Sequence, residues 1–210
     1  MMRRSSRMRF VRGTLFYLML AVILLITILP FLWMLSSSFK GQEAIRTIPI
    51  RWIPERPTLE GYERVFNMQG FSFTRASLNS LLLAVGCTVA EVASSAMAAF
   101  VFAKLPFKGS GKVFGIYLAT MMIPNTVTMV PNYIILRSLG LLDTYTGLIL
   151  PYLGKAFSVF LMRQSMLGVN DAYLESAFLD GASLYRVFWK IMLPMVTPTL
   201  ATLTLISFMG

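Results

Sequence analysis

The sequence has no histidine, a single cysteine and few charged residues, and these absences exclude several classes of function. Without histidine, the chain lacks the commonest general base and the commonest transition-metal ligand. Cys87 alone forms no internal disulfide and gives no metal-ligand spacing. The chain also shows no recognisable nucleophile–base set and no GxxxxGK[ST] phosphate-binding loop. We therefore expect a protein that is not an enzyme and that binds no metal or cofactor itself.

Charge is scarce, because only 13% of the 210 residues are charged while 56% are hydrophobic. A soluble domain carries about 25% charged residues and about 45–50% apolar residues. The surplus of apolar surface indicates a protein in a lipid bilayer. The formal charge of +10 does not point to nucleic acid, because the basic residues lie at the ends of apolar runs, which is typical of membrane topology. The predicted fold class is an all-α, polytopic transmembrane helix bundle.

Five stretches are long and apolar enough to span a bilayer, which takes about 20 residues. They cover about residues 14–35, 78–103, 113–136, 146–167 and 191–210. A cleaved signal peptide is the alternative for the first, but this run is longer than typical and no small-x-small cleavage pattern follows it closely. Residues 1–13 form a basic tail, and the connection from Ser36 to Ser77 is too polar for lipid. Together, 14–210 form one transmembrane domain.

Basic residues near the span ends predict the orientation of the chain in a cell membrane. They gather in the N-terminal tail and in the connections that follow the second and fourth spans. These residues are Arg3, Arg4, Arg7, Arg9, Arg12, Lys104, Lys108, Lys112, Arg163, Arg186 and Lys190. All three groups lie on one side if every stretch crosses the bilayer. We expect that side, including the N-terminus, to be cytoplasmic.

Polar and charged residues inside the spans are candidates for a translocation path. Glu91 and Lys155 lie deep in the second and fourth spans, where charges are unfavourable and face protein or water. They either line the path, as a pair, or satisfy structural needs through an interhelical hydrogen bond and snorkelling. Pro124 and Pro131 interrupt the third span, and we expect its helix to break there. Asn125 and Thr128 either contact substrate or repair the break.

The connection at 168–190 contains a predicted helix that begins at Asn170 or Asp171. Its apolar and small residues recur at helical spacing on one face, with Glu175 and Asp180 beside them. The residues of that face are Leu174, Ala177, Phe178, Gly181 and Tyr185. Such a face is typical of a helix that docks in a groove. The alternative, a helix on the membrane surface, usually carries basic residues, whereas this one is acidic.

The same connection resembles the EAA loop of binding-protein-dependent ABC importer permeases. The matching positions are Glu175, Ser176, Ala177, then Gly181 after three residues, and Ile191, Leu193 and Pro194 further on. Ser176 departs from the second alanine that is usual in the family. The resemblance implies that the 170–186 helix is a coupling helix in a cleft of a cytoplasmic ATPase. It implies contact through Glu175, Ala177, Phe178, Asp180 and Gly181.

The likeness extends over nearly the whole chain. Residues 57–66, 98–109 and 121–153 look like the maltose-type, carbohydrate-importing branch, and specifically its second and shorter permease. The resemblance implies the type I importer permease fold with six spans, of which five are present, so we expect a C-terminally truncated chain. It implies as partners a second permease subunit, an ABC ATPase dimer that holds ATP and Mg, an extracytoplasmic solute-binding protein and membrane lipid.

The predicted function is a permease subunit that translocates a sugar in an ATP-driven importer. One alternative is an ion-coupled secondary transporter that uses Glu91 and Lys155, although the two halves show no convincing inverted repeat. The other is an importer permease for a non-sugar solute such as glycerol phosphate. The substrate within these classes is not predicted.

Overall fold

The structure, a computed structural model, describes residues 3–105 and 107–210, with side chains from Arg12 onward. In these residues the chain forms helices joined by turns and no strand, which confirms the all-α class. The basic side chains Arg3, Arg4, Arg7 and Arg9 of the predicted tail lie outside the described part. The chain divides into two compact units, residues 1–76 and 77–210. Each unit is described by itself.

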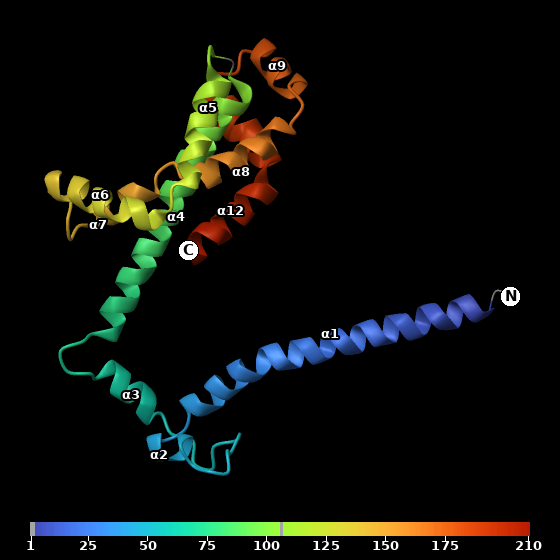
Figure 1. Cartoon of the computed structure of the whole chain (residues 1–210), viewed down its shortest axis with the longest axis vertical. Coiled ribbons are helices and arrows are strands. Elements are labelled where there is room, and N and C mark those ends of the chain that lie inside the picture. Colours follow the sequence, from blue (N-terminus) through green and yellow to red (C-terminus); the bar gives the residue numbers. More distant parts are fainter. Residues whose placement is uncertain (1–2, 106) are drawn as a thin grey trace. The chain divides into compact units, whose positions relative to one another are not determined.

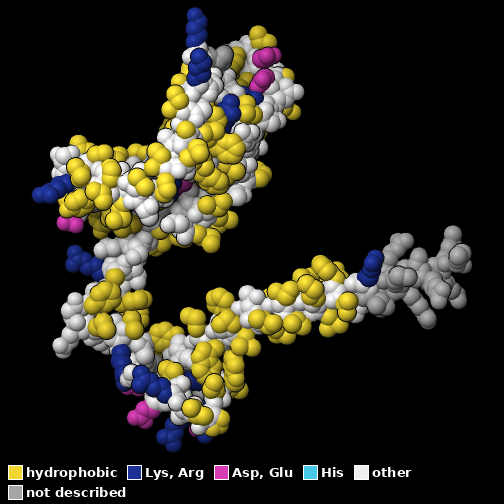
Figure 2. Space-filling model, viewed as in Figure 1, with side chains coloured by type: hydrophobic (Ala, Val, Ile, Leu, Met, Phe, Trp, Pro, Cys, Tyr) yellow, Lys and Arg dark blue, Asp and Glu magenta, His cyan; other side chains and the backbone are white. Residues whose placement is uncertain are grey.

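The first unit is dominated by one long helix, α1 (Arg3–Ser38), drawn in blue in Figure 1. The portion from Arg12 to Ser38 is long and apolar enough to cross a membrane, and none of its most apolar stretch is buried in the protein. Figure 2 shows hydrophobic side chains along this helix. A helix that is hydrophobic on all sides suits lipid or a protein interior, and not water.

The polar connection after α1 folds back on the end of that helix. It contains two short helices, α2 (Gln42–Ile45) and α3 (Glu60–Phe66). The buried Lys40 ammonium donates to the Arg51 carbonyl at 2.6 Å and lies 4.1 Å from the centre of the Trp33 ring. Tyr62 bonds Ser38 at 3.0 Å. These contacts give the connection a defined shape beside the end of α1.

The second unit continues α4 (Phe73–Lys104) and adds the remaining helices. These are α5 (Ser110–Ala119), α6 (Asn125–Ser138), α7 (Tyr145–Ile149), α8 (Ala156–Leu167), α9 (Ala172–Leu179), α10 (Leu184–Val187), α11 (Leu193–Met195) and α12 (Thr197–Met209). Its core contains Ala99 of α4, Met162 and Met166 of α8, and Leu203 of α12, all fully buried. The small residues of α4 let its neighbours approach closely.

Within residues 3–105 and 107–210, two helices and three bent pairs have the length and composition of membrane spans. α1 and α4 contain the first two predicted spans, and the bent pairs cover the other three. The pairs bend by 102° between Met122 and Asn125, by 47° between Tyr152 and Ala156, and by 82° between Met195 and Thr197. The count of five spans stays a prediction, because it holds only if each bent pair crosses the membrane once.

The predicted break of the third span occurs at Pro124 but not at Pro131. Pro124 directly precedes α6 with extended backbone, at φ −60° and ψ 139°. Pro131 lies inside α6, and the helix continues through it. A proline inside a helix removes one backbone hydrogen bond and adds a local clash, and neighbouring turns can absorb both. The expectation of a second interruption was therefore wrong.

The corner in the second bent pair, which covers the fourth predicted span, is tied to two other helices. Gly154 has φ +61°, a left-handed conformation that suits glycine. Its backbone N–H donates to Ser94 Oγ of α4 at 2.9 Å, and its carbonyl accepts from the Tyr117 hydroxyl of α5. Both backbone polar groups of Gly154 are thus satisfied by side chains. The third bent pair, which covers the fifth predicted span, contains a π-helical turn at Phe188–Met192. This turn comes just before Pro194, which has no backbone N–H to donate in a regular helical turn.

Candidate functional site

α9 lies at one end of the second unit (Figure 1), where the sequence predicts the docking helix. Its start agrees with the expectation, because Asn170 Oδ1 accepts a hydrogen bond from the Ala172 N–H at 3.0 Å. The helix ends at Leu179. Gly181 follows with φ +77°, its N–H donates to Phe178 O at 3.0 Å, and the Ala182 N–H donates to Ala177 O at 2.9 Å. This is a Schellman termination, so the predicted continuous 170–186 helix is wrong.

The early end of α9 also changes which side chains face outward. Leu174 and Ala177 are buried against the rest of the unit, with Ala177 only 8% exposed. Ala177 therefore faces the interior of the unit, and its predicted contact with an ATPase stays a prediction. The small alanine instead lets α9 approach the helices beneath it. Tyr185 lies on α10, beyond the turn at Gly181.

The outward side of this region combines exposed apolar and acidic residues, and we call it the α9 surface. Its members are Tyr173, Glu175, Phe178, Leu179, Asp180 and Tyr185. Leu179 is 88% exposed although it is large and apolar. Periodicity did not single out Tyr173 or Leu179. Their only signal in the sequence is their position inside the EAA-like segment.

The charge of the α9 surface is negative. Figure 2 shows acidic side chains over α9. Asp171, at the start of the helix, is paired with Lys104, whereas Glu175 and Asp180 form no ion pair in the described part of the chain. In residues 3–105 and 107–210, no cluster of three or more Cys, Asp or Glu could hold a metal ion. The α9 surface is therefore suited to a protein partner whose own binding surface carries basic groups.

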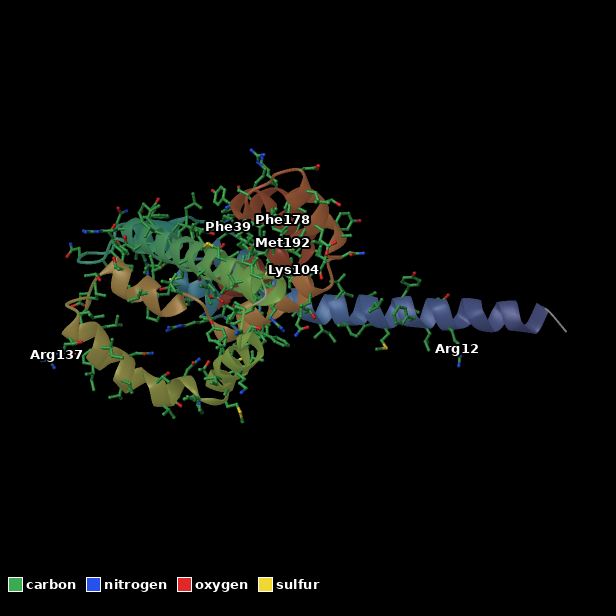
Figure 3. The ribbon with its side chains drawn as sticks, turned by 90° about the horizontal axis from the view of Figure 1, so that it is seen from above. Arg12, Phe39, Lys104, Arg137, Phe178 and Met192 are labelled. Atoms are coloured by element: carbon green, nitrogen blue, oxygen red, sulfur yellow. The ribbon has the colours of Figure 1, made fainter. Side chains whose placement is uncertain are left out.

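Two basic residues tie the end of α4 to its neighbours, Lys104 to the start of α9 and Arg163 to α8, a role that sequence reasoning missed. The Lys104 ammonium donates to the Val169 carbonyl at 2.6 Å and pairs with Asp171. Arg163 of α8 donates from Nε to Phe102 O at 3.2 Å. Figure 3 labels Lys104 of α4 and Phe178 of α9 among the side chains of the chain. From the sequence alone, Lys104 and Arg163 indicated only the orientation of the chain in the membrane.

The structure brings Glu91 and Lys155 together. Glu91 is buried on α4, and its Oε1 accepts a hydrogen bond from Ser158 Oγ at 2.5 Å. Lys155 Nζ lies 3.0 Å from Oε2, close enough for an ion pair although the angle is poor for a hydrogen bond. Lys155 Nζ also lies 4.1 Å from the centre of the Tyr152 ring. The lysine side chain remains 43% exposed, so the pair has one buried and one accessible partner.

Asn125 and Thr128 form a separate, local arrangement. Asn125 is the first residue of α6, and the Thr128 hydroxyl donates to its carbonyl at 3.1 Å. In the part of the chain that the structure describes, no hydrogen bond joins either residue to Glu91 or Lys155. The geometry is that of a hydroxyl bonded within the first turn of a helix after a proline. Whether the two residues meet substrate stays a prediction.

We expect Gly181→Ala to destabilise the second unit by about 1 kcal/mol, because an L-residue is disfavoured in the left-handed region. Space is not the cause, since nothing lies within 4 Å of a Cβ at this position. Gly181→Asn is the control, because asparagine tolerates this conformation better. Thermal unfolding in detergent should rank the variants as glycine, asparagine and alanine. Equal losses for alanine and asparagine would contradict a conformational cause.

Comparison with known proteins identifies the family. Residues 91–210 match the family described as binding-protein-dependent transport system inner membrane component. The chain is 32% identical over 187 residues to the diacetylchitobiose uptake system permease protein NgcG of Streptomyces coelicolor. That match covers 88% of this chain and 61% of the relative. It is also 32% identical to the arabinooligosaccharides transport system permease protein AraQ of Bacillus subtilis, over 92% of this chain and 68% of that one.

A solved structure supports the same relationship. It is a crystal structure of a bacterial ABC transporter involved in the import of the acidic polysaccharide alginate. The TM-score is 0.85 at 25% identity, and the match covers 97% of this chain and 71% of that one. The chain spans 57% to 68% of the length of the first three curated relatives. Together with its apolar helices, these matches show that this multi-pass inner-membrane chain belongs to the binding-protein-dependent transport system inner membrane components, the permease subunits of ABC importers.

Proposed function

We propose that this chain is a permease subunit of an ATP-driven sugar importer and that the α9 surface docks on the cytoplasmic ATPase. One observation carries the proposal. Leu179 stands exposed beside Glu175 on α9, a short helix whose buried side is anchored in the unit, and the exposed Asp180 and Tyr185 follow it in the chain. A preformed helix with apolar anchors and a charged rim suits a protein groove. ATP and Mg belong to the partner, since this chain has no phosphate-binding loop.

The orientation follows from the distribution of basic residues. Lys104 ends α4, Lys108 precedes α5 and Lys112 lies in the first turn of α5. Arg186 and Lys190 follow α9. Under the positive-inside rule, these connections and the N-terminus face the cytoplasm. The α9 surface then lies on the side where ATP is available. The connection between α1 and α4 lies on the other side, where a solute-binding protein would deliver the substrate. A second permease subunit, beside this chain in the membrane, would complete the path.

A saccharide is the proposed substrate. Two relatives serve the uptake of diacetylchitobiose and the transport of arabinooligosaccharides, and the solved neighbour is involved in the import of alginate. Within this chain, Glu91 and Lys155 are the proposed polar lining of the path, because one member of the pair remains accessible. Asn125 and Thr128 are weaker candidates for the lining, since the threonine hydroxyl is already bonded inside α6.

We expect Leu179→Asp to weaken binding of the ATPase by roughly thirtyfold, about 2 kcal/mol, as for the loss of an apolar anchor at an interface. The chain is expressed with the ABC ATPase of its host, purified in detergent, and titrated with that ATPase to give Kd. Ile53→Asp is the matched control, because Ile53 is 82% exposed but lies in the connection between α1 and α4. It should leave Kd unchanged.

Two results would count against docking through α9. One is an equal Kd for the wild type and Leu179→Asp, with both chains correctly folded. The other is an equal loss for Leu179→Asp and Ile53→Asp, which would indicate general damage from the new charge. Failure of the wild type itself to bind any ABC ATPase would defeat the proposed function.

A further inference from the structure

Lys104, the last residue of α4, is buried although it carries a charge. Its side chain is only 4% exposed. A lysine at a helix C-terminus ordinarily reaches its own last carbonyls or extends into water. This one instead contacts residues 65 and 67 positions further along the chain, in the link between α8 and α9. A buried ammonium is tolerated only when it is paired and hydrogen-bonded, so these two contacts determine where the link lies.

The contacts of Lys104 fall at the start of α9. One partner is the Val169 carbonyl, at 2.6 Å, and the other is the Asp171 carboxylate directly before the helix. Asn170, between them, caps α9 through the Ala172 N–H. The residues that hold Lys104 are therefore the residues that begin α9. A displacement of α9 along its axis must either carry the end of α4 with it or break both contacts.

A second cation, Arg163, also holds the last turn of α4, but it does so from α8. Arg163 of α8 donates to the Phe102 carbonyl, in the last turn of α4, at 3.2 Å. Its guanidinium also lies 4.2 Å from the centre of the Phe114 ring of α5. Charges packed on aromatic faces and bonded to carbonyls hold a fixed geometry. The last turn of α4 is thus tied to α8 through Arg163 and to α9 through Lys104.

We propose that Lys104 transmits movement of α9 to α4. The inference rests on the proposed docking of an ATPase on the α9 surface. When the ATPase displaces α9, the Lys104 contacts with Val169 and Asp171 draw α4 along. α4 carries Glu91 roughly 20 Å earlier in the same helix, so the displacement reaches the Glu91–Lys155 pair. Lys104 is a positioning residue, because it touches neither ATP nor the solute.

The test separates docking from coupling. The assembled transporter, with its ATPase and second permease, is reconstituted in proteoliposomes, and sugar uptake and ATP hydrolysis are measured in the same vesicles. For Lys104→Met, binding of the ATPase should stay within twofold of wild type, while uptake per ATP hydrolysed falls at least tenfold. Lys104→Arg keeps the charge and the donors, and should restore at least half of the ratio.

Lys108→Met is the matched control. Lys108 lies shortly after Lys104, in the link between α4 and α5. It is exposed and forms no ion pair in the described part of the chain. It should leave the ratio of uptake to hydrolysis unchanged. If Lys104→Met fails to fold, Asp171→Asn replaces it, because Asp171 is 71% exposed and its substitution leaves the Lys104–Val169 hydrogen bond in place. Asp171→Asn should lower the ratio at least threefold.

Three outcomes would overturn the inference. A folded Lys104→Met variant with a normal ratio would show that α9 and α4 need no such link. Loss of ATPase binding in that variant would show that Lys104 shapes the docking surface and does not transmit movement. A normal ratio for Asp171→Asn, where it stands in for an unfolded Lys104→Met, would be equally contrary. Absence of ATPase binding by the wild type would refute the proposed function itself. That result differs from the three above, in all of which the wild type binds the ATPase.

Discussion

Replacing Lys155 with leucine is expected to destabilise the second unit by about 3 kcal/mol, because Glu91 then keeps a buried charge without a cation. Breaking a buried ion pair costs about 3–5 kcal/mol. The lower end applies here, since the Lys155 side chain is 43% exposed and water already screens part of the attraction. Unfolding free energies in mixed micelles measure the change.

Substitution of the other member of the pair, Glu91, should destabilise the second unit much less. Glu91→Gln removes the buried charge, and its amide oxygen can still accept the hydrogen bond from Ser158. Lys155 is left with its accessible side and the face of the Tyr152 ring. We expect a loss of about 1 kcal/mol, typical of a weakened hydrogen bond. The double variant should be more stable than Lys155→Leu alone, because no charge is left buried.

These values also provide a sharp test of the proposed path. If Lys155→Leu and Glu91→Gln destabilise equally, the asymmetry between a buried and an accessible partner is wrong. The double variant, which we expect to fold, can be assayed for uptake in the assembled transporter. Unchanged uptake rate and unchanged sugar preference would remove Glu91 and Lys155 from the translocation path and leave them a structural pair.

Gly147→Ala is expected to destabilise the second unit by about 3 kcal/mol, the upper end of the range for overpacking. Gly147 is buried in α7, and a Cβ at this position would overlap the carbonyl oxygen of Leu141. The Leu141 carbonyl cannot easily yield, because it accepts from Thr144 Oγ1 at 2.8 Å. That hydroxyl oxygen in turn accepts from the Gly147 N–H at 3.0 Å. The steric overlap outweighs the gain of about 1 kcal/mol that alanine brings to a helix.

Gly115→Ala is the matched control for this prediction. Gly115 lies inside α5, and nothing stands within 4 Å of the position of a Cβ. Only the helix propensity then operates, so alanine should stabilise the chain by about 0.5–1 kcal/mol. Opposite signs for the same substitution in two helices would confirm the packing argument. Stabilisation by Gly147→Ala, measured by the same unfolding experiment, would contradict it.

The sequence predicted continuous helices better than interrupted ones. α1 and α4 follow directly from long apolar runs, whose composition alone requires a lipid-compatible helix. The corner at Pro124 was also predictable, because proline at a helix start has a local cause. The corner at Gly154 was not, because it depends on hydroxyls that α4 and α5 supply from distant parts of the chain.

The candidate site shows the same division between local and distant causes. The start of α9 follows from Asn170, a short-range capping residue. Its end at Leu179 depends on Gly181, which periodicity treated as a small residue on a helix face and which in fact terminates the helix. The burial of Ala177 and the partners of Lys104 depend on tertiary packing. No pattern along the sequence specifies which basic residue is buried.

The two corners in neighbouring bent segments differ in stiffness. At Gly154 the backbone is held by Ser94 and Tyr117, so this corner is braced and behaves as a rigid elbow. At Pro124, within the described chain, the flanking bonds run only to the adjacent turns, as from Ile123 N to Thr120 O at 3.2 Å. Bending of these segments is therefore expected to concentrate at Pro124. Amide hydrogen exchange should be slow at Gly154 and fast at Ile123.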